Sequence, residues 1–282
     1  TASIIVPGIM DTILNVGMND SVVSYLVSLN QGYIKFALDL HRRFLYMFGV
    51  LVLRNSTVKY ERVMDTAMEM DNADTVAQLS CQSLTYVVGE FKRFTTAPND
   101  PYEQLDMVIE AMYQHSLSPR VSEYLDSYAT SIPQIPRSLA VIVQMMVYGN
   151  LNSNSGCGVA FSRPLSQDND TDGRPVGEFL AKAEGKEVLE GDRNATPIED
   201  FSCTMPKAYS DLEKHMSVLE EKHKAVEYVE FTVEDGVLYV LETSAVNLQP
   251  NKKEARFVVY YDLLRKLQEE EENEECKELL NS

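Results

Sequence analysis

Two acidic side chains, Glu230 and Glu242, are the residues of this sequence whose type and spacing best suit a chemical role, the binding of a metal ion. They belong to segments 226–233 and 237–242, in which apolar and polar side chains alternate as they do in strands. The Glu-Asp-Gly between the segments favours a tight turn, so the sequence predicts a β-hairpin. A pair of carboxylates suits Mg²⁺, which proteins hold through one or two carboxylates together with substrate phosphates.

The register of this hairpin decides which side chains share a face. A three-residue turn flanked by Val233 and Val237 makes the two carboxylates diagonal neighbours, roughly 7–8 Å apart. The predicted polar face then consists of Tyr228, Glu230, Glu242 and Ser244. The predicted core face consists of Val229, Phe231, Val233, Val237, Tyr239 and Leu241. The alternative is a merely solvated polar face, because a slip of one residue exchanges the two faces.

Two loops of small residues are candidates for contact with a phosphate. Residues 155–158 read Ser-Gly-Cys-Gly and precede a predicted strand, so backbone N–H groups there can approach an anion. An ordinary turn is the alternative reading of this segment. The second loop, around Pro7 and Gly8, contains no cation of its own.

The four cysteines and four histidines do not add a metal or nucleophile site. The cysteines lie far apart and form no C-x-x-C motif, so we expect free thiols in a reducing intracellular compartment, cytoplasmic or organellar. His215 and His223 are eight residues apart on a predicted helix, too far to share a metal ion.

The elements that position these residues fall into two kinds. Helical periodicity runs from about residue 21 to 130, and Asp100 before Pro101 marks one helix start. Residues 139–148 form a nearly continuous apolar run that predicts a buried strand. Further strands are predicted at 158–162 and 176–180, and an amphipathic helix is predicted to begin at Met205-Pro206.

The composition limits the class of protein. With 282 residues, 44% hydrophobic and 24% charged, the chain has the make-up of a globular protein. Its net charge of −18 and the lack of a basic stripe argue against nucleic acid and anionic membrane surfaces as partners. No apolar stretch is long enough to predict a membrane span.

The order of the motifs resembles the ATP-binding domain of the pyruvate phosphate dikinase family, which is ATP-grasp-like. Each motif alone is weak, but many occur in order between about residue 2 and residue 245. The matching segments are 7–20, 35–49, 100–105, 118–120, 143–150, 155–163, 177–180, 205–206 and 230–232.

The resemblance implies an α+β fold, an ATP-grasp-like domain with an inserted helical subdomain. Residues 1–20 and 131–250 would form the sheet subdomains, 21–130 the helical insertion, and 251–282 an acidic helical tail or linker. The implied ligand is Mg-ATP, with Glu230 and Glu242 as metal ligands. The implied nucleotide-binding residues are Gly8, Ile9, Met10, Asp11, Gln144, Met145, Met146, Val147, Ser155, Gly156 and Gly158.

The sequence departs from the family pattern at the hairpin. The family has Asp where this chain has Tyr228, Gln where it has Glu242, and a phosphate-binding Arg where it has Ser244. Two further family cations precede the segment that matches Thr1, and the phosphohistidine and pyruvate domains are not in this sequence, so we expect a truncated form. Losing three phosphate-binding cations costs on the order of 4–9 kcal/mol of binding free energy.

These departures favour a degenerate domain that acts as a structural or interaction module in a larger assembly. The alternative is an ATP-binding half that works with a phosphohistidine domain on a partner. Exposed sheet edges need cover, so a protein partner is expected in either case.

Overall fold

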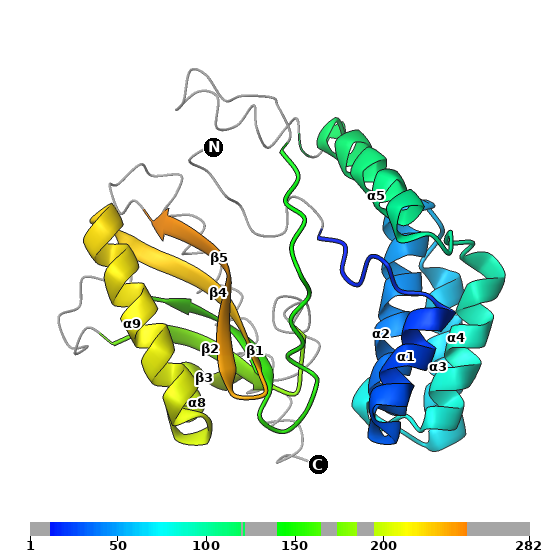
Figure 1. The fold of residues 1–282 in the computed structure, drawn as a ribbon, viewed down its shortest axis with the longest axis horizontal. Coiled ribbons are helices and arrows are strands. Elements are labelled where there is room, and N and C mark those ends of the chain that lie inside the picture. Colours follow the sequence, from blue (N-terminus) through cyan, green and yellow to red (C-terminus); the bar gives the residue numbers. More distant parts are fainter. Residues whose placement is uncertain (1–11, 120, 122–139, 165–173, 185–194, 247–282) are drawn as a thin grey trace, which may run out of the picture. The chain divides into compact units, whose positions relative to one another are not determined.

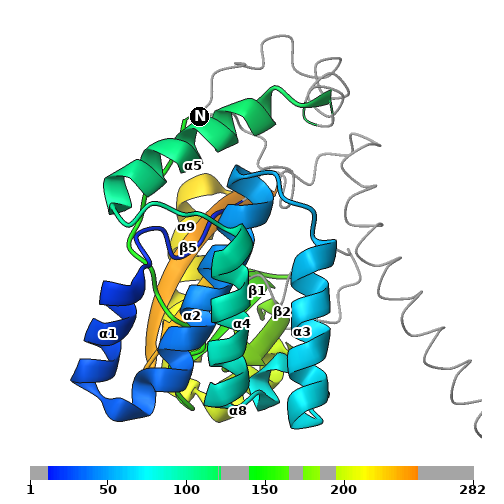
Figure 2. The same cartoon turned by 90° about the vertical axis from the view of Figure 1, so that its right-hand side faces the viewer.

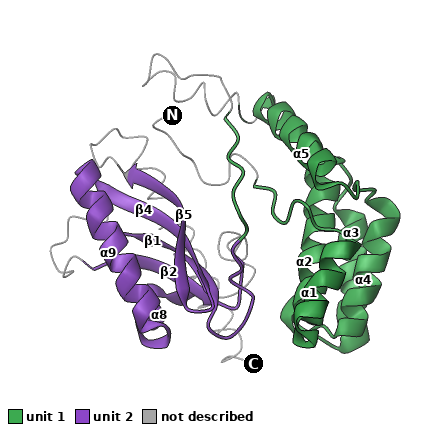
Figure 3. Cartoon of the chain, viewed as in Figure 1, with its two compact units in different colours: residues 1–146 green, residues 147–282 purple. Residues whose placement is uncertain are grey.

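The chain forms two compact units, residues 1–146 and 147–282 (Figure 3). The first is helical and the second contains a sheet, so the protein is mixed α+β, as predicted (Figure 1). The computed structural model describes residues 12–119, 121, 140–164, 174–184 and 195–246.

The helical unit is built around α4, which packs against α2 on one side and α3 on the other (Figure 2). Its aromatic core includes Phe44, Phe48, Tyr60 and Phe91, all fully buried. The helices are α1 (Asp20–Leu29), α2 (Ile34–Met47), α3 (Val58–Asp71), α4 (Cys81–Phe94) and α5 (Pro101–Ser116). Short turns connect them: η1 (Gln31–Tyr33), the π-helical turn η2 (Phe48–Val52) that continues α2, and η3 (Val76–Gln78).

Helix α5 begins where the sequence predicts it. The Asp100 side chain accepts a hydrogen bond from the backbone N–H of Tyr102 at 2.8 Å, which satisfies one of the donors at the helix start. Pro101 occupies the first turn, where its missing N–H costs nothing. The prediction of a helix opening at this pair is confirmed.

The second unit is a five-stranded antiparallel sheet with two helices on one face (Figure 1). The strands lie in the order β3-β2-β1-β4-β5, so β4 and β5 form the hairpin at one end of the described sheet. The elements are β1 (Gly156–Phe161), β2 (Val176–Ala181), β3 (Thr196–Pro197), α8 (Ile198–Thr204), α9 (Pro206–His223), β4 (Val226–Glu234) and β5 (Val237–Val246).

We call the side of the sheet packed by α8 and α9 the helix-covered face. Its centre is a stack of three rings, in which Phe201 lies 4.4 Å from Phe179 and 5.4 Å from Phe231 between centroids. Leu212 and Met216 of α9 are buried against these rings. The predicted strands at 158–162 and 176–180 and the helix from Pro206 are therefore confirmed.

The predicted buried strand at 139–148 is wrong over its described part, residues 140–148. This segment forms neither helix nor strand, and the side chains of Ile142 and Met145 are 84% and 82% exposed. An apolar run forms a strand only where a neighbouring strand takes up its hydrogen bonds, and no described strand pairs with this segment.

Two further sequence expectations concern thiols and membranes. Among the described residues, Cys81, Cys157 and Cys203 are not in disulfides, and Cys276 lies outside the described residues. None of the described helices combines the length and apolar character needed to cross a bilayer.

Candidate functional site

The β4–β5 hairpin brings Glu230 and Glu242 directly opposite each other. Its turn has two residues, Asp235 and Gly236, because Glu234 pairs with Val237. Both turn residues have positive φ, 49° and 80°, as the tight turns that join twisted strands require. The predicted three-residue turn is therefore wrong.

A β-bulge corrects the register in the middle of the hairpin. Phe231 pairs with Val240, but Glu230 pairs with Glu242, so Leu241 is the extra residue. The four residues of the predicted polar face still share one face, as two cross-strand pairs: Glu230 with Glu242 and Tyr228 with Ser244. Side chains at directly opposed positions have Cβ atoms about 4.5–5.5 Å apart, closer than the predicted diagonal.

The predicted core face is wrong near the turn. Because the turn is one residue shorter than expected, Leu238 is the residue that packs against the buried cluster. Val237 and Tyr239, which were expected in the core, are 51% and 37% exposed.

The side of the sheet opposite α8 and α9 is the acidic face, which carries Tyr228, Glu230, Glu242 and Ser244. The Tyr228 hydroxyl donates a hydrogen bond to Glu230 Oε1 at 2.8 Å. Burial, with the Glu230 carboxylate opposite as a second cause, raises the pKa of Glu242. The face thus holds two half-buried carboxylates whose repulsion a cation would relieve.

A third carboxylate, Glu178, lies on the same face. Val159 of β1 pairs with Glu230 on one side and with Glu178 of β2 on the other, and paired residues share a face. The sequence alone does not place Glu178 on this face, because its position depends on the pairing of strands that are distant in the sequence. Phe161 also belongs here, with its ring 5.3 Å from that of Tyr228.

Ser155, predicted to face a phosphate, holds the hairpin turn in place. Its hydroxyl accepts a hydrogen bond from the backbone N–H of Asp235 at 3.0 Å and lies 3.1 Å from Asn152 Oδ1. The Asn152 amide in turn donates to Asp235 Oδ1 at 2.9 Å. The fully buried Ser155 therefore couples the loop before β1 to the β4–β5 turn.

Gly156 and Gly158 lie in β1 with their Cα hydrogens toward the helix-covered face. A Cβ atom on Gly156 would come within 2.4 Å of the Phe179 ring, and one on Gly158 within 2.6 Å of the Phe231 ring. Both positions therefore require glycine because aromatic rings of the neighbouring strands lie across them.

The roles of the other predicted nucleotide-binding residues stay a prediction. Gln144, Met145 and Met146 fall in the helical unit and Val147 in the sheet unit, while residues 8–11 (Gly8, Ile9, Met10 and Asp11) lie outside the described residues. Directly after Val147, the backbone N–H of Tyr148 donates a hydrogen bond to Glu234 Oε2 at 2.6 Å.

Glu230 and Glu242 are the described residues of this face that can hold a divalent cation. Over the described part of the chain, no three His, Cys, Asp or Glu side chains are arranged to bind a metal ion. Mg²⁺ usually completes its shell with water and substrate phosphate oxygens, so two carboxylates fit a metal that arrives with a phosphate ligand.

Comparison with known proteins gives one consistent answer. The chain is 35% identical over 252 residues to pyruvate, phosphate dikinase 1 of Arabidopsis thaliana, an alignment covering 86% of this chain and 25% of the relative. It is 31% identical over 288 residues to the pyruvate, phosphate dikinase of Rickettsia conorii, an alignment that covers 95% of this chain and 32% of the relative. The chain is homologous to part of pyruvate, phosphate dikinase. No family model matches it.

The homology to pyruvate, phosphate dikinase confirms the resemblance drawn from the motifs. The chain spans about a quarter to a third of the length of these dikinases. Measured against the dikinase pattern given above, the two departures at Tyr228 and Ser244 occupy one cross-strand pair. The third departure, Glu242, is the direct partner of Glu230.

Proposed function

We propose that this chain is a divergent dikinase-like ATP-site domain that has lost phosphoryl transfer and acts as a structural or interaction module in a larger assembly. The ATP-grasp-like part would be residues 1–20 and 131–250, to which the sheet unit contributes from Val147 onward, and residues 21–130 would be a helical insertion. The observation that carries the proposal is the pairing of Tyr228 with Ser244, where the family pattern has Asp and a phosphate-binding Arg.

The charge of the acidic face supports the loss of phosphoryl transfer. Strands β1, β2, β4 and β5 contain no Lys or Arg, while Glu178, Glu230 and Glu242 share one face. Phosphoryl transfer depends on positioning and on positive groups that stabilise the charge of the transferred phosphate. One lost hydrogen bond to a charged group weakens binding by about 1.5–3 kcal/mol, or about 10- to 150-fold.

A second function, Mg-ATP binding as a phosphotransfer half, is favoured by the opposed carboxylates. The raised pKa of Glu242 reflects burial and repulsion from Glu230, and a divalent cation between them would offset both. In this case the ATP phosphates would complete the metal shell, and a partner would supply the histidine that accepts the phosphoryl group.

Calorimetric titration of Mg-ATP into the purified chain separates the two functions. The first proposal predicts no binding tighter than millimolar and no AMP formation with pyruvate and phosphate. Micromolar binding that is lost in Glu230→Gln but kept in Glu221→Gln, an exposed control on α9, would instead establish the second function. AMP formation by the chain alone would overturn the first proposal.

Restoring the family pair tests the stated cause directly. The double variant Tyr228→Asp, Ser244→Arg places an ion pair where the chain has a cross-strand Tyr–Ser pair. We expect Mg-ATP affinity to rise by at least about tenfold, since one charge-assisted phosphate contact is regained. An unchanged affinity would show that the lost function does not reside in this pair.

The module role predicts association with protein. Strand β5 pairs only with β4 in the described sheet, so its outer edge has backbone groups without strand partners there. We expect sedimentation velocity to show either that the purified chain self-associates or that it stays in a stable complex with a protein that copurifies with it. A monodisperse monomer that copurifies with no protein would contradict this role.

A further inference from the structure

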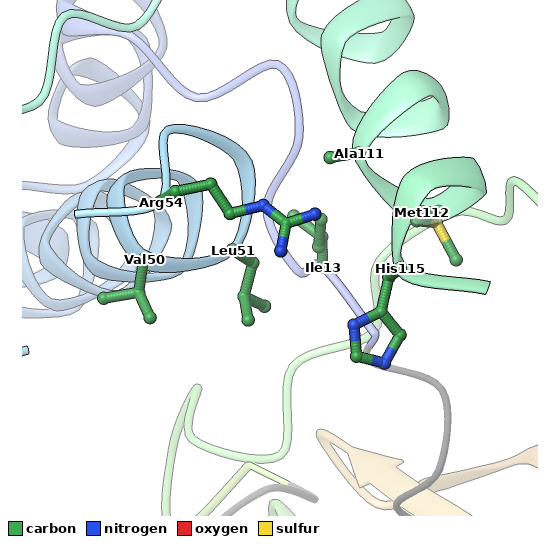
Figure 4. Close-up of a pocket in the computed structure, with 7 residues that line it drawn as sticks. All are labelled: Ile13, Val50, Leu51, Arg54, Ala111, Met112 and His115. Atoms are coloured by element: carbon green, nitrogen blue, oxygen red, sulfur yellow. The ribbon is translucent and has the colours of Figure 1, made fainter. Parts of the chain in front are cut away.

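A small cavity opens in the helical unit beside the π-helical turn η2, with a volume of about 60 Å³ (Figure 4). Its apolar wall comes from η2, the segment before α1, and α5. That wall consists of Ile13, Val50, Leu51, Ala111 and Met112. Two basic side chains, Arg54 and His115, complete the lining. All of the lining residues belong to the helical unit.

Arg54 reaches into this cavity from the segment that follows η2 (Figure 4). Its backbone has a φ of 58°, a left-handed conformation that costs a non-glycine residue roughly 1–2 kcal/mol. Among the described residues, no hydrogen bond or ion pair engages its guanidinium. Arg54 is an exposed residue, so its charge is accessible to an anion in solution.

The backbone that presents Arg54 is held in place from both sides. Before it, the N–H of Leu53 donates to the Phe48 carbonyl at 3.0 Å and closes the π-helical turn. After it, the Asn55 amide donates to the Tyr60 hydroxyl at 3.1 Å and to the Phe94 carbonyl at 2.9 Å. The backbone of Arg54 is therefore fixed, and binding an anion has to order only its side chain. Short π-helical turns of this kind occur frequently at functional sites.

The chemistry of the lining specifies the ligand. A guanidinium pairs with a carboxylate or a phosphate through two parallel hydrogen bonds, so it favours a ligand that carries one of these groups. The apolar wall offers nothing to a second charge but fits an aliphatic chain. One water needs about 10–15 Å³, so 60 Å³ holds only a few non-hydrogen atoms.

We propose that this cavity is a binding site for a short-chain aliphatic carboxylate, with its carboxylate on Arg54 and its chain against Ile13, Leu51 and Met112. His115 of α5 also lines the opening (Figure 4). The site needs neither a metal nor the acidic face.

Butyrate is the probe for the first experiment, titrated into the full chain and followed by NMR shifts or calorimetry at low salt. We expect saturable binding, at least about tenfold weaker in Arg54→Gln and unchanged in Arg62→Gln, an exposed arginine of α3. Equal affinities of wild type and Arg54→Gln would overturn the proposal. No saturation up to about 50 mM butyrate would also overturn it.

Two further variants separate the binding role of Arg54 from a structural one. Arg54→Gly accepts the left-handed backbone without strain, so it should fold at least as well as wild type and still lose butyrate binding. Ala111→Leu fills the apolar part and should abolish binding while Arg54 remains. If Arg54→Gly binds butyrate with the affinity of wild type, the proposal that Arg54 holds the carboxylate is wrong.

Two control ligands test the proposed chemistry. Butan-1-ol has the chain without the charge, and inorganic phosphate has charge without a chain, so both should bind at least about tenfold more weakly than butyrate. Phosphate binding as tightly as butyrate would replace the proposed site with a simple anion site. Butanol binding as tightly would show that Arg54 does not select the ligand.

Discussion

The two faces of the sheet in the second unit are built on different principles. The helix-covered face is apolar and close-packed, with the rings of Phe179, Phe201 and Phe231 stacked at its centre. The acidic face carries half-buried polar groups, among them Glu230 and Glu242 directly opposite each other. The helix-covered face therefore depends on packing, whereas the acidic face combines opposed charges with a smaller buried apolar cluster.

This difference predicts which substitutions each face tolerates. On the covered face, a change of one methyl group matters because interior atoms are packed at crystal density. On the acidic face, removing a charge can leave stability unchanged or raise it, because the charges there repel. The fold and the candidate site are thus largely separable by mutation.

The largest effect is expected from Phe231→Ala on the covered face. The side chain is 1% exposed and contacts two other rings, so its loss leaves a cavity and should lower the free energy of unfolding by about 3–5 kcal/mol. Because the chain has two units, amide hydrogen exchange of β1 and β4 is the measurement that reports this unit alone. Phe161→Ala, on the acidic face and only partly buried, is the control and should cost less than half as much.

Similar losses in the two variants would show that the acidic face is packed as tightly as the covered one. That result would remove the distinction between them.

The second effect concerns the glycines of β1. In Gly158→Ala the new methyl group would lie 2.5 Å from the Glu178 carbonyl oxygen and 2.6 Å from the Phe231 ring, which should destabilise the unit by about 1–3 kcal/mol. Gly89→Ala in α4 meets nothing within 4 Å and should stabilise its helix by about 0.5–1 kcal/mol. Thermal unfolding of both variants gives the comparison.

If Gly158→Ala proves neutral in stability but weakens Mg-ATP binding, the glycine serves a ligand rather than the Phe231 ring. That outcome would favour the second proposed function.

The local signals of the sequence predicted most of the elements but not their long-range pairing. Alternation and turn residues located the hairpin, and Asp100 before Pro101 located α5. The bulge at Leu241 could not be predicted, because it depends on how β4 and β5 fit the neighbouring strands. The membership of Glu178 in the acidic face depends in the same way on the pairing of β1 with β2.

At residues 140–148 the sequence predicts a strand that the structure does not form. Its apolar, β-branched composition is typical of a buried strand, yet Ile142 is 84% exposed. Composition reports what a segment can bury, whereas a strand forms only where another backbone pairs with it.

A third, smaller effect is expected from Tyr228→Phe on the acidic face. The substitution removes the 2.8 Å hydrogen bond to Glu230 Oε1 and should cost about 0.5–1.5 kcal/mol of unfolding free energy at pH 7. Tyr239→Phe, in the same hairpin and 37% exposed, is the matched control and should change nothing measurable. Exchange rates of the β4 amides distinguish the two variants, and equal rates would mean that the Tyr228 bond contributes no stability.

The smallest effect, and the one that most sharpens the contrast between the faces, is expected from Glu242→Gln. Burial and the opposed Glu230 raise the pKa of Glu242 above its ordinary 4.5, so the folded protein holds this proton more tightly than the unfolded chain. Stability from this group is present below pH 4.5 and is lost as the pH rises through the folded-state pKa. Glutamine carries no charge, so the variant should exceed wild type by about 0.2–1 kcal/mol at pH 7 and match it below pH 4.5.

Unfolding free energies at pH 4 and pH 7 test this, with Glu221→Gln on α9 as the control that should show no pH-dependent difference. Parallel pH profiles of wild type and Glu242→Gln would mean that the two carboxylates do not repel each other. The acidic face would then be an ordinary solvated surface, and the case for a cation between Glu230 and Glu242 would lose its electrostatic basis.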